Sequence, residues 1–213
     1  MQSGEEFAHV FSVSRETREK LETYVDLLKR WQKTINLVAP ATLNHTWHRH
    51  MADSAQLLAL APGDARAWVD LGSGGGFPGL VLGIMLGERS GARMTLVESD
   101  SRKAAFLREV ARTVAAPVDI VCGRIENAAT QFSLASVDVV TARALAPLPR
   151  LLGLCRPLFG PTTIALLLKG RDAEVELAEA HAEWSSTWPF AADLVPSRTD
   201  KEGRIVVVRA LVV

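Results

Sequence analysis

Hydrophobic and polar residues follow two different patterns along the chain, and the change falls near residue 66. In residues 14–35 apolar side chains recur every three to four positions, the spacing of one face of an α-helix. Ser14 is a suitable N-cap for this helix, and Glu16 falls in its first turn. A second helix is expected from about residue 44 to 60. Residues 1–65 are therefore predicted to form an N-terminal helical extension.

From residue 67 onward, short apolar runs alternate with longer helical patterns. Strands are predicted at 67–71, 94–98, 118–122, 137–142 and 163–169, and helices at 78–87, 101–115, 147–157 and 172–186. This alternation is typical of βαβ units, in which helices cover both faces of a mainly parallel sheet. Two last apolar runs, 190–195 and 203–213, have only a polar loop between them, which favours an antiparallel pair. Residues 66–213 are thus predicted to be an α/β domain with a seven-stranded, mainly parallel sheet closed by an antiparallel hairpin.

Composition excludes several classes of protein. Of the 213 residues 48% are hydrophobic and 23% charged, and no apolar run approaches the ~18 residues of a membrane span. The first ten residues are acidic where a signal peptide would be basic, so a cytoplasmic location is expected. Lys and Arg (24) balance Asp and Glu (24), so any polyanion site must come from local clustering. Cys122 and Cys155 lack the paired spacing of a zinc site, and both are expected to be core thiols.

The stretch "VDLGSGGGFPGL", residues 69–80, leads an apolar strand into a loop with five glycines. Its spacing fits a phosphate loop, a dinucleotide-binding loop and the D-x-G-x-G-x-G pattern of an S-adenosylmethionine site. Leu80 and Val81 stand where a phosphate loop needs Lys and Ser or Thr, which excludes that reading. Pro78 has no N–H to offer a pyrophosphate, which weakens the dinucleotide reading. The methyl-donor reading needs only close backbone approach, which glycine permits; the remaining alternative is a purely structural turn.

Residues at or just after the ends of the predicted strands are further candidates for this site. Glu98 ends the second strand, where a carboxylate can accept the two ribose hydroxyls of an adenosine ligand. After the third strand, Ile125 and Glu126 suit a purine ring and its amine, unless they are only surface residues. Arg143, after the fourth strand, is expected to face the donor's methionyl end or the acceptor. The antiparallel closing hairpin then favours a methyltransferase over a dinucleotide-binding enzyme.

The segment "NHTWHRHMADS" concentrates histidines immediately before the α/β part of the chain. His45 and His48 have helical spacing, but no nearby cysteine or third carboxylate completes a metal site, so no metal is expected. The basic residues of the 14–35 helix alternate with acids, which leaves an RNA-binding patch and a solvated face as equal alternatives. We find no base or cysteine motif for activating an acceptor, and guanine N7 would need only positioning.

Seven motifs in order, from residue 36 to 170, resemble the RsmG (GidB) family, bacterial methyltransferases that modify a guanine N7 of 16S rRNA: "NLVAP", "RHMADS", "DLGSGGGFPG", "LVESDSRKAAFLREV", "GRIE", "ARALAPL" and "LLLKG". The resemblance implies a Rossmann-like class I methyltransferase fold, S-adenosyl-L-methionine as cofactor without a metal, and 16S rRNA as partner within the 30S subunit or its precursor. A monomer is expected. The alternatives are a methyltransferase for another substrate and a non-catalytic RNA-binding or ribosome-assembly module.

The motif positions also suggest which residues form the site. The expected donor-binding residues are Asp70, Gly72, Gly74, Gly76, Phe77, Glu98, Ile125, Glu126 and Arg143. By motif position, the candidates on the acceptor side are His50, Asp53, Arg143 and Lys169. For Lys169, a structural lysine at a strand end is an equal alternative. The segment after Gly170 carries no assignment beyond completing the fold.

Overall fold

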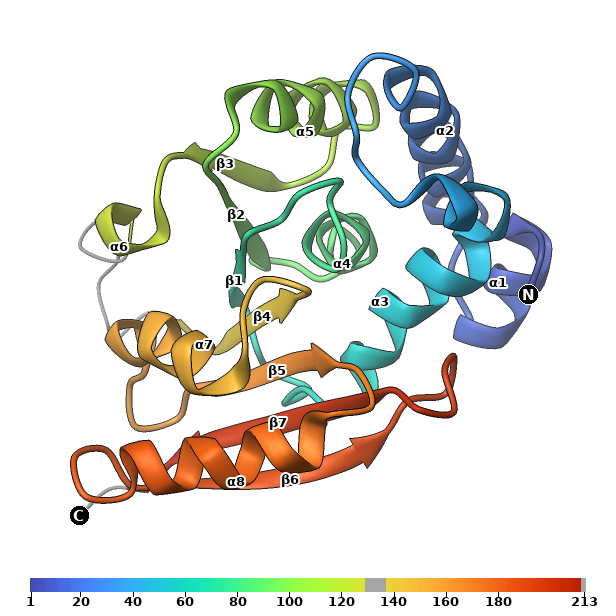
Figure 1. Ribbon diagram of the computed structural model, residues 1–213. Coiled ribbons are helices and arrows are strands. Elements are labelled where there is room, and N and C mark those ends of the chain that lie inside the picture. Colours follow the sequence, from blue (N-terminus) through green and yellow to red (C-terminus); the bar gives the residue numbers. More distant parts are fainter. Residues whose placement is uncertain (129–136, 212–213) are drawn as a thin grey trace.

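The computed structural model describes residues 1–128 and 137–211 (Figure 1). The N-terminal helices are α1 (Gly4–Phe11) and α2 (Arg15–Trp31), followed by a 3-10 helix (Pro40–His45), a π-helical turn (Trp47–Ala52), α3 (Asp53–Ala55) and a second 3-10 helix (Gln56–Ala59). The strands are β1 (Ala67–Leu71), β2 (Arg93–Glu98), β3 (Val118–Cys122), β4 (Val139–Arg143), β5 (Ile164–Lys169), β6 (Phe190–Pro196) and β7 (Arg204–Ala210). The helices between them are α4 (Gly79–Leu86), α5 (Ser101–Thr113), α6 (Ile125–Ala128), α7 (Leu148–Cys155), a 3-10 turn (Arg156–Leu158) and α8 (Ala173–Trp184).

The strands form one seven-stranded sheet in the order β3-β2-β1-β4-β5-β7-β6. The first five run parallel, and β7 is antiparallel to both β5 and β6. The predicted α/β fold and its closing hairpin are confirmed; positions 212–213 of the last predicted strand lie outside the described residues. Because Leu71 pairs with Val97 and with Ala142, the ends of β2, β1 and β4 share one edge of the sheet. The loops that follow these strands are thereby brought together.

The N-terminal segment differs in part from the prediction. Helix α2 begins as predicted, with the Ser14 hydroxyl accepting the Thr17 amide. Residues 44–60 are helical but change from 3-10 to π to α geometry rather than forming one regular helix. The Thr46 and Ser54 hydroxyls donate to carbonyls three and four residues earlier, which competes with a regular helical ladder. Helix α1 was not predicted.

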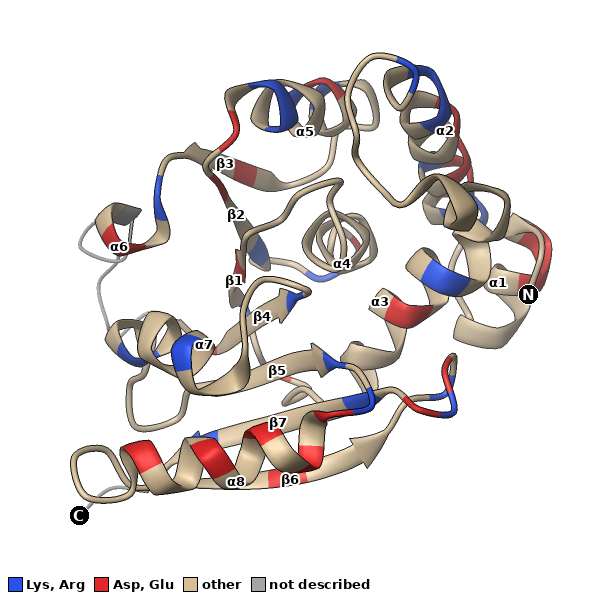
Figure 2. Ribbon diagram, viewed as in Figure 1, with Lys and Arg blue, Asp and Glu red and all other residues tan. Residues whose placement is uncertain are grey.

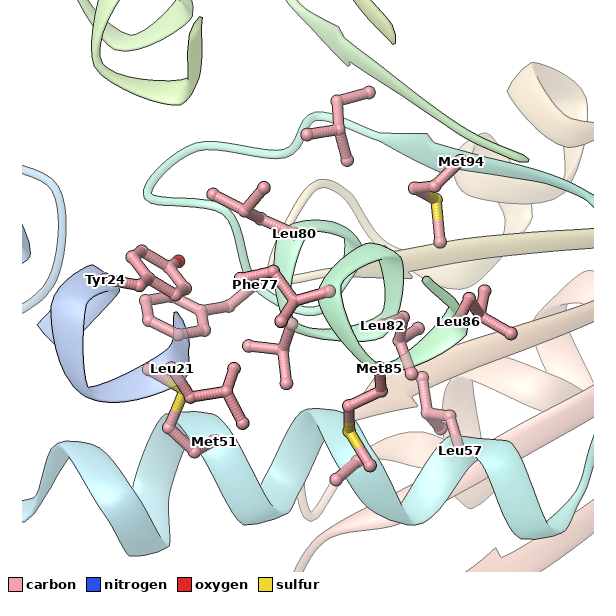
Figure 3. Packing of buried hydrophobic residues seen from close by; sticks show 14 of the residues in the cluster. Leu21, Tyr24, Met51, Leu57, Phe77, Leu80, Leu82, Met85, Leu86 and Met94 are labelled. Carbon is pink, nitrogen blue, oxygen red and sulfur yellow. The ribbon is translucent and has the colours of Figure 1, made fainter. Parts of the chain in front are cut away.

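Helix α4 lies inside the protein, between the sheet and the N-terminal helices. All eight of its residues are buried, because β2 covers one side and α2 and α3 cover the other. Figure 3 shows Leu21 and Tyr24 of α2, with Met51 and Leu57 of the following segment, packed on the α4 side chains and Phe77. A helix that is apolar on all sides requires such enclosure. The N-terminal residues therefore share the core of the α/β part, and the division of the chain at residue 65 stays a prediction.

The opposite face of the sheet carries α7 and α8, which pack around a second core cluster. Cys155 lies in this cluster with no exposed surface, as predicted, and burial raises the pKa of its thiol to about 12. The same expectation for Cys122 was wrong: its side chain is exposed, because β3 is an edge strand of the sheet. Among the described residues no helix is long and apolar enough to cross a membrane.

Candidate active site

The glycine loop between β1 and α4 has a backbone that other residues rarely adopt. Gly72, Gly74 and Gly76 have φ angles of 66°, 55° and 96°, in the left-handed region that glycine enters without strain. A side chain at Gly72 would meet Leu145, and one at Gly76 would meet the Tyr24 hydroxyl, whereas the position above Gly74 is open. Gly72 and Gly74 line a cavity in front of the loop, and Gly76 faces the interior. The glycines therefore permit the tight course of this loop.

Asp70 lies beneath this loop and not in the wall of the cavity. Its side chain is fully buried, and Oδ1 accepts a hydrogen bond of 2.6 Å from the Thr141 hydroxyl. Burial raises the pKa of the Asp70 carboxyl to about 6, although the hydrogen bond from the Thr141 hydroxyl partly opposes this. Asp70 thus supports the loop from below, and a direct contact of its side chain with a ligand does not fit this position.

A second support comes from Tyr24 on α2, which the sequence had indicated only as a core residue. Its hydroxyl donates to the carbonyl of Gly75, and its ring stacks on Phe77 with 5.4 Å between centroids. Burial raises the pKa of Tyr24 well above its ordinary value, which keeps the hydroxyl protonated as a donor. Helix α2 therefore holds the middle of the glycine loop in place.

Glu98 lies at the end of β2 and closes the other side of the cavity. Its Oε2 accepts the Gly74 amide at 2.7 Å, and its Oε1 accepts the Asp100 amide at 2.8 Å. Each carboxylate oxygen has a further lone pair, which can accept a hydroxyl group. Glu98 as a residue is 94% buried, yet it lines the cavity, so its carboxylate presents a fixed pair of acceptors to any ligand there.

The donor cavity, as we call this first cavity, has a volume of about 420 Å³, within the range of small-molecule sites. Seven of the predicted donor residues line it: Gly72, Gly74, Phe77, Glu98, Ile125, Glu126 and Arg143. Asp70 and Gly76 are the two that do not line it. It also contains residues that the sequence did not single out: Leu37, Lys103, Ala144 and Arg150. These lie on loops and helices whose proximity depends on the tertiary fold.

A second cavity of about 520 Å³, here called the acceptor-side cavity, adjoins the first. It is lined by all four of the predicted acceptor-side residues, His50, Asp53, Arg143 and Lys169. Leu37, Arg143 and Ala144 line both cavities, so these residues form the boundary between them. Ala144 has a φ of 52°, a conformation that costs a residue with a side chain about 1–2 kcal/mol. The backbone at the boundary is therefore held in an unusual shape.

Arg143 is held at this boundary by several contacts. Its Nη2 donates to His50 Nδ1 at 2.8 Å, and its Nη1 donates to the Arg49 carbonyl at 3.1 Å and to Asp53 Oδ2 at 3.2 Å. The guanidinium carbon also lies 5.3 Å from the centre of the Phe77 ring, a cation–π distance. Contacts on this many sides fix the direction of the guanidinium group.

The tautomer of His50 follows from its neighbours. Because arginine can only donate, Nδ1 accepts, and the ring proton lies on Nε2, which donates to the Thr42 hydroxyl at 2.8 Å. The Thr42 hydroxyl in turn donates to the Ala39 carbonyl. Burial, with the charges of Arg143 and Arg49, lowers the pKa of His50 to about 3. His50 is therefore a neutral acceptor for Arg143 with both ring nitrogens engaged, which does not fit a general base.

Lys169 is also engaged within the chain. Its ammonium forms an ion pair with Glu176 at 2.6 Å and donates to the Ala146 carbonyl at 2.9 Å. Glu176 additionally accepts the Leu148 amide at the start of α7. These contacts hold the loop from β4 to α7, which includes the boundary residue Ala144. The position of Lys169 thus fits support of this loop from the acceptor side.

Within the described residues, no three His, Cys, Asp or Glu side chains gather as a metal site would require. His48, one of the two histidines with ligand spacing, contacts the Thr199 carbonyl through Nε2. The absence of a metal from the reaction stays a prediction.

The sheet order, the closing hairpin and a glycine-loop cavity at the carboxyl edge define a Rossmann-like fold of the class I methyltransferase type. An O-methyltransferase from Bacillus cereus, solved in complex with SAH, has this fold with a TM-score of 0.61 and 15% identity, and each chain covers 90% of the other. Residues 17–202 match the GidB family, described as rRNA small subunit methyltransferase G, and the chain belongs to this family.

Two curated relatives in this family are similar over nearly their full length. A ribosomal RNA small subunit methyltransferase G from Parvibaculum lavamentivorans is 53% identical over 207 residues, covering 97% of this chain and 89% of the relative. Its counterpart from Methylorubrum extorquens is 52% identical over 206 residues, covering 95% and 94%. The predicted family is thus confirmed.

Proposed function

We propose that this protein transfers a methyl group from S-adenosyl-L-methionine to N7 of a guanine in 16S rRNA. We further propose that it acts as a monomer in the cytoplasm, on the 30S subunit or its precursor. The observation that carries the proposal is the meeting of two cavities at Arg143 and Ala144. One cavity has the residues of a methyl-donor site, and the other lies where an acceptor would have to reach the donated group.

The donor cavity fits S-adenosylmethionine by the chemistry of its walls. When bound, this cofactor supplies an electrophilic methyl group on a positively charged sulfur. Glu98 presents fixed acceptors suited to ribose hydroxyls, and Ile125 offers an apolar surface suited to adenine. The open position above Gly74 lets the backbone of the loop approach the ligand. Pro78, which follows the loop, is no hindrance to a ligand without phosphate groups.

The acceptor-side cavity fits an acceptor that is already nucleophilic. Guanine N7 carries a free lone pair, so no proton has to leave before methyl transfer. His50 is neutral with both ring nitrogens bonded, so it is not available as a base, and guanine N7 does not require one. Arginine donors match O6 on the guanine major-groove edge, and a contact there leaves the N7 lone pair free to attack the methyl group. We expect Arg143 to orient the base at the boundary, and catalysis to rest on orientation more than on proton transfer.

Charge on the surface favours one direction of approach for RNA. The exposed side of α8 is acidic and would repel phosphates, as Figure 2 shows for this helix. The rim of the donor cavity instead carries Lys103, Arg124 and Arg150, for which no ion pair occurs among the described residues. We expect the RNA backbone to meet this rim and to avoid α8. On α2, Arg15, Arg18 and Lys20 are paired with glutamates, which favours a solvated face at that end.

The test is a map of N7-methylguanine in 16S rRNA from cells with and without the gene. We expect one methylated guanine to disappear on deletion and to return when the gene is restored. Purified protein should then methylate 30S subunits or naked 16S rRNA, but not a protein mixture. An unchanged rRNA map would refute the rRNA substrate, and a failure to bind S-adenosylhomocysteine in calorimetry would favour a non-catalytic module.

A further inference from the structure

The loop that joins β6 to β7 lies against the helical segment 47–59, far from it in the sequence (Figure 1). Thr199 of this loop donates its hydroxyl to Asp53 Oδ1 at 2.6 Å and accepts His48 Nε2 at its carbonyl at 2.9 Å. Further contacts join the loop to the same segment, among them the hydrogen bond from the Arg198 amide to Gln56 at 2.8 Å and the Arg49–Asp200 ion pair at 2.8 Å. The C-terminal hairpin is therefore fastened to the segment that carries His50 and Asp53.

Asp53 connects this loop to the candidate active site. Its two oxygens are divided between two sets of partners: Oδ2 accepts Arg143, whereas Oδ1 accepts Thr199 and, at 3.0 Å, Gln56. A carboxylate can rotate about its last bond unless both oxygens are held. The Asp53 and Arg143 side chains are 84% and 81% buried, so little water is available to replace either partner. The part of the Arg143 orientation that comes from Asp53 thus depends on how Oδ1 is held, while His50 and the Arg49 carbonyl hold the guanidinium independently.

We propose that Thr199 is a positioning residue of the methyl-transfer site, acting through Asp53 to set the direction of the Arg143 guanidinium between the two cavities. The proposal rests on the proposed function. It assigns a role in the reaction to the polar loop 197–203, whose Ser197, Asp200 and Gly203 also line the acceptor-side cavity. The substrate-facing group remains Arg143, because Thr199 reaches the reaction only through Asp53.

The hairpin itself does not depend on the Thr199 hydroxyl. Strand β7 is paired with β6 along its full length and with β5 from Arg204 to Arg209, and the Arg198–Gln56 and Arg49–Asp200 contacts remain when the hydroxyl is removed. Thr199→Val keeps the shape of the side chain and removes its hydroxyl, which donates to Asp53 and accepts from Ser197 of the same loop at 3.0 Å. The variant is therefore expected to fold, and a defect in it would report on the position of Asp53.

The test compares Thr199→Val with the wild type in methyl transfer to small-subunit rRNA and in S-adenosylhomocysteine binding. We expect kcat to fall about five- to tenfold, the change that follows from losing one charge-assisted hydrogen bond. The dissociation constant of S-adenosylhomocysteine should stay within about twofold, because Thr199 does not line the donor cavity. Thr199→Ser, which retains the hydroxyl, should restore kcat.

Two further comparisons make the result specific. Asp53→Ala removes the carboxylate that connects Thr199 to Arg143. In that variant, Thr199→Val should have no additional effect on kcat. Asp193→Asn, which breaks an exposed ion pair with Arg209 on the same hairpin, should leave kcat unchanged. Additive effects of the two substitutions, an unchanged kcat in Thr199→Val, or a parallel loss of donor binding and thermal stability would each overturn the proposal. An inactive wild type would instead refute the proposed function.

Discussion

The substitution Gly74→Leu tests whether the methyl donor binds against the glycine loop. Gly74 has a φ of 55°, lines the donor cavity, and has open space where a side chain would begin, with only the Gly72 carbonyl within 4 Å at 3.8 Å. A leucine there should extend into the cavity without disturbing the core. Gly91 is a matched control, because its φ is 76°, a side chain there would also meet nothing within 4 Å, and it does not line the cavity.

The size of the effect can be worked out from this geometry. A residue with a side chain in the left-handed region costs about 1–2 kcal/mol, so both variants should lose about 2–8 °C in melting temperature. At roughly 30 Å³ for each water-sized group, four leucine carbons fill about 120 Å³, more than a quarter of the 420 Å³ cavity. A ligand that needs this space would lose at least about 100-fold in affinity, or about 2.7 kcal/mol.

The assay is calorimetric titration with S-adenosylhomocysteine, together with thermal unfolding of both variants. We expect Gly74→Leu and Gly91→Leu to melt at similar temperatures, with donor binding lost only in Gly74→Leu. If Gly74→Leu bound within a few-fold of Gly91→Leu, the placement of the donor against this loop would be wrong. If Gly91→Leu also lost binding, the effect would come from strain and not from the cavity.

Three further predictions concern charged groups. Arg143→Lys should lower kcat about tenfold or more, because lysine keeps the charge but not the planar fork that meets His50 and Asp53; an unchanged kcat in a methyl-transfer assay would count against its role. Glu98→Gln should weaken S-adenosylhomocysteine binding about tenfold, because one oxygen that accepts a backbone amide becomes a donor; equal affinity in calorimetry would remove the ribose assignment. The pKa of Asp70, raised from 3.8 to about 6, means that the folded state keeps a proton that the unfolded state has already released. The free energy of unfolding of the wild type, taken relative to that of Asp70→Asn in denaturant titrations, should therefore fall by about 3 kcal/mol as the pH rises from about 4 to above 6. The comparison removes the opposite contribution of His50, whose lowered pKa makes the folded state more stable as the pH rises through this range; a difference between the two proteins that did not change with pH would contradict the assigned shift.

Much of the fold could be predicted from the sequence because the relevant signals are local. The helical spacing of residues 14–35 and the alternation after residue 67 reflect which side chains must face a core. Once the strands are parallel, their carboxyl ends meet at one edge, which is why Glu98, Ile125, Glu126 and Arg143 were correctly expected to lie near each other. The order of seven motifs was likewise sufficient to predict the family.

Other features depended on contacts that no local pattern reveals. Tyr24 holds the carbonyl of a glycine 51 residues away, and Thr199 reaches Asp53 across 146 residues. The sequence identified Asp70 and His50 as candidates, but their protonation depends on burial in the folded protein. Asp70 lies beneath the loop, where burial raises its pKa, and burial lowers the pKa of His50, which makes it a neutral partner of Arg143. Thus the sequence alone determined the elements, their sheet edge and the chemical types gathered there, because these follow from periodicity and chain direction. Only the tertiary structure decided which side chains face a ligand and which support their neighbours, because that depends on packing between distant segments.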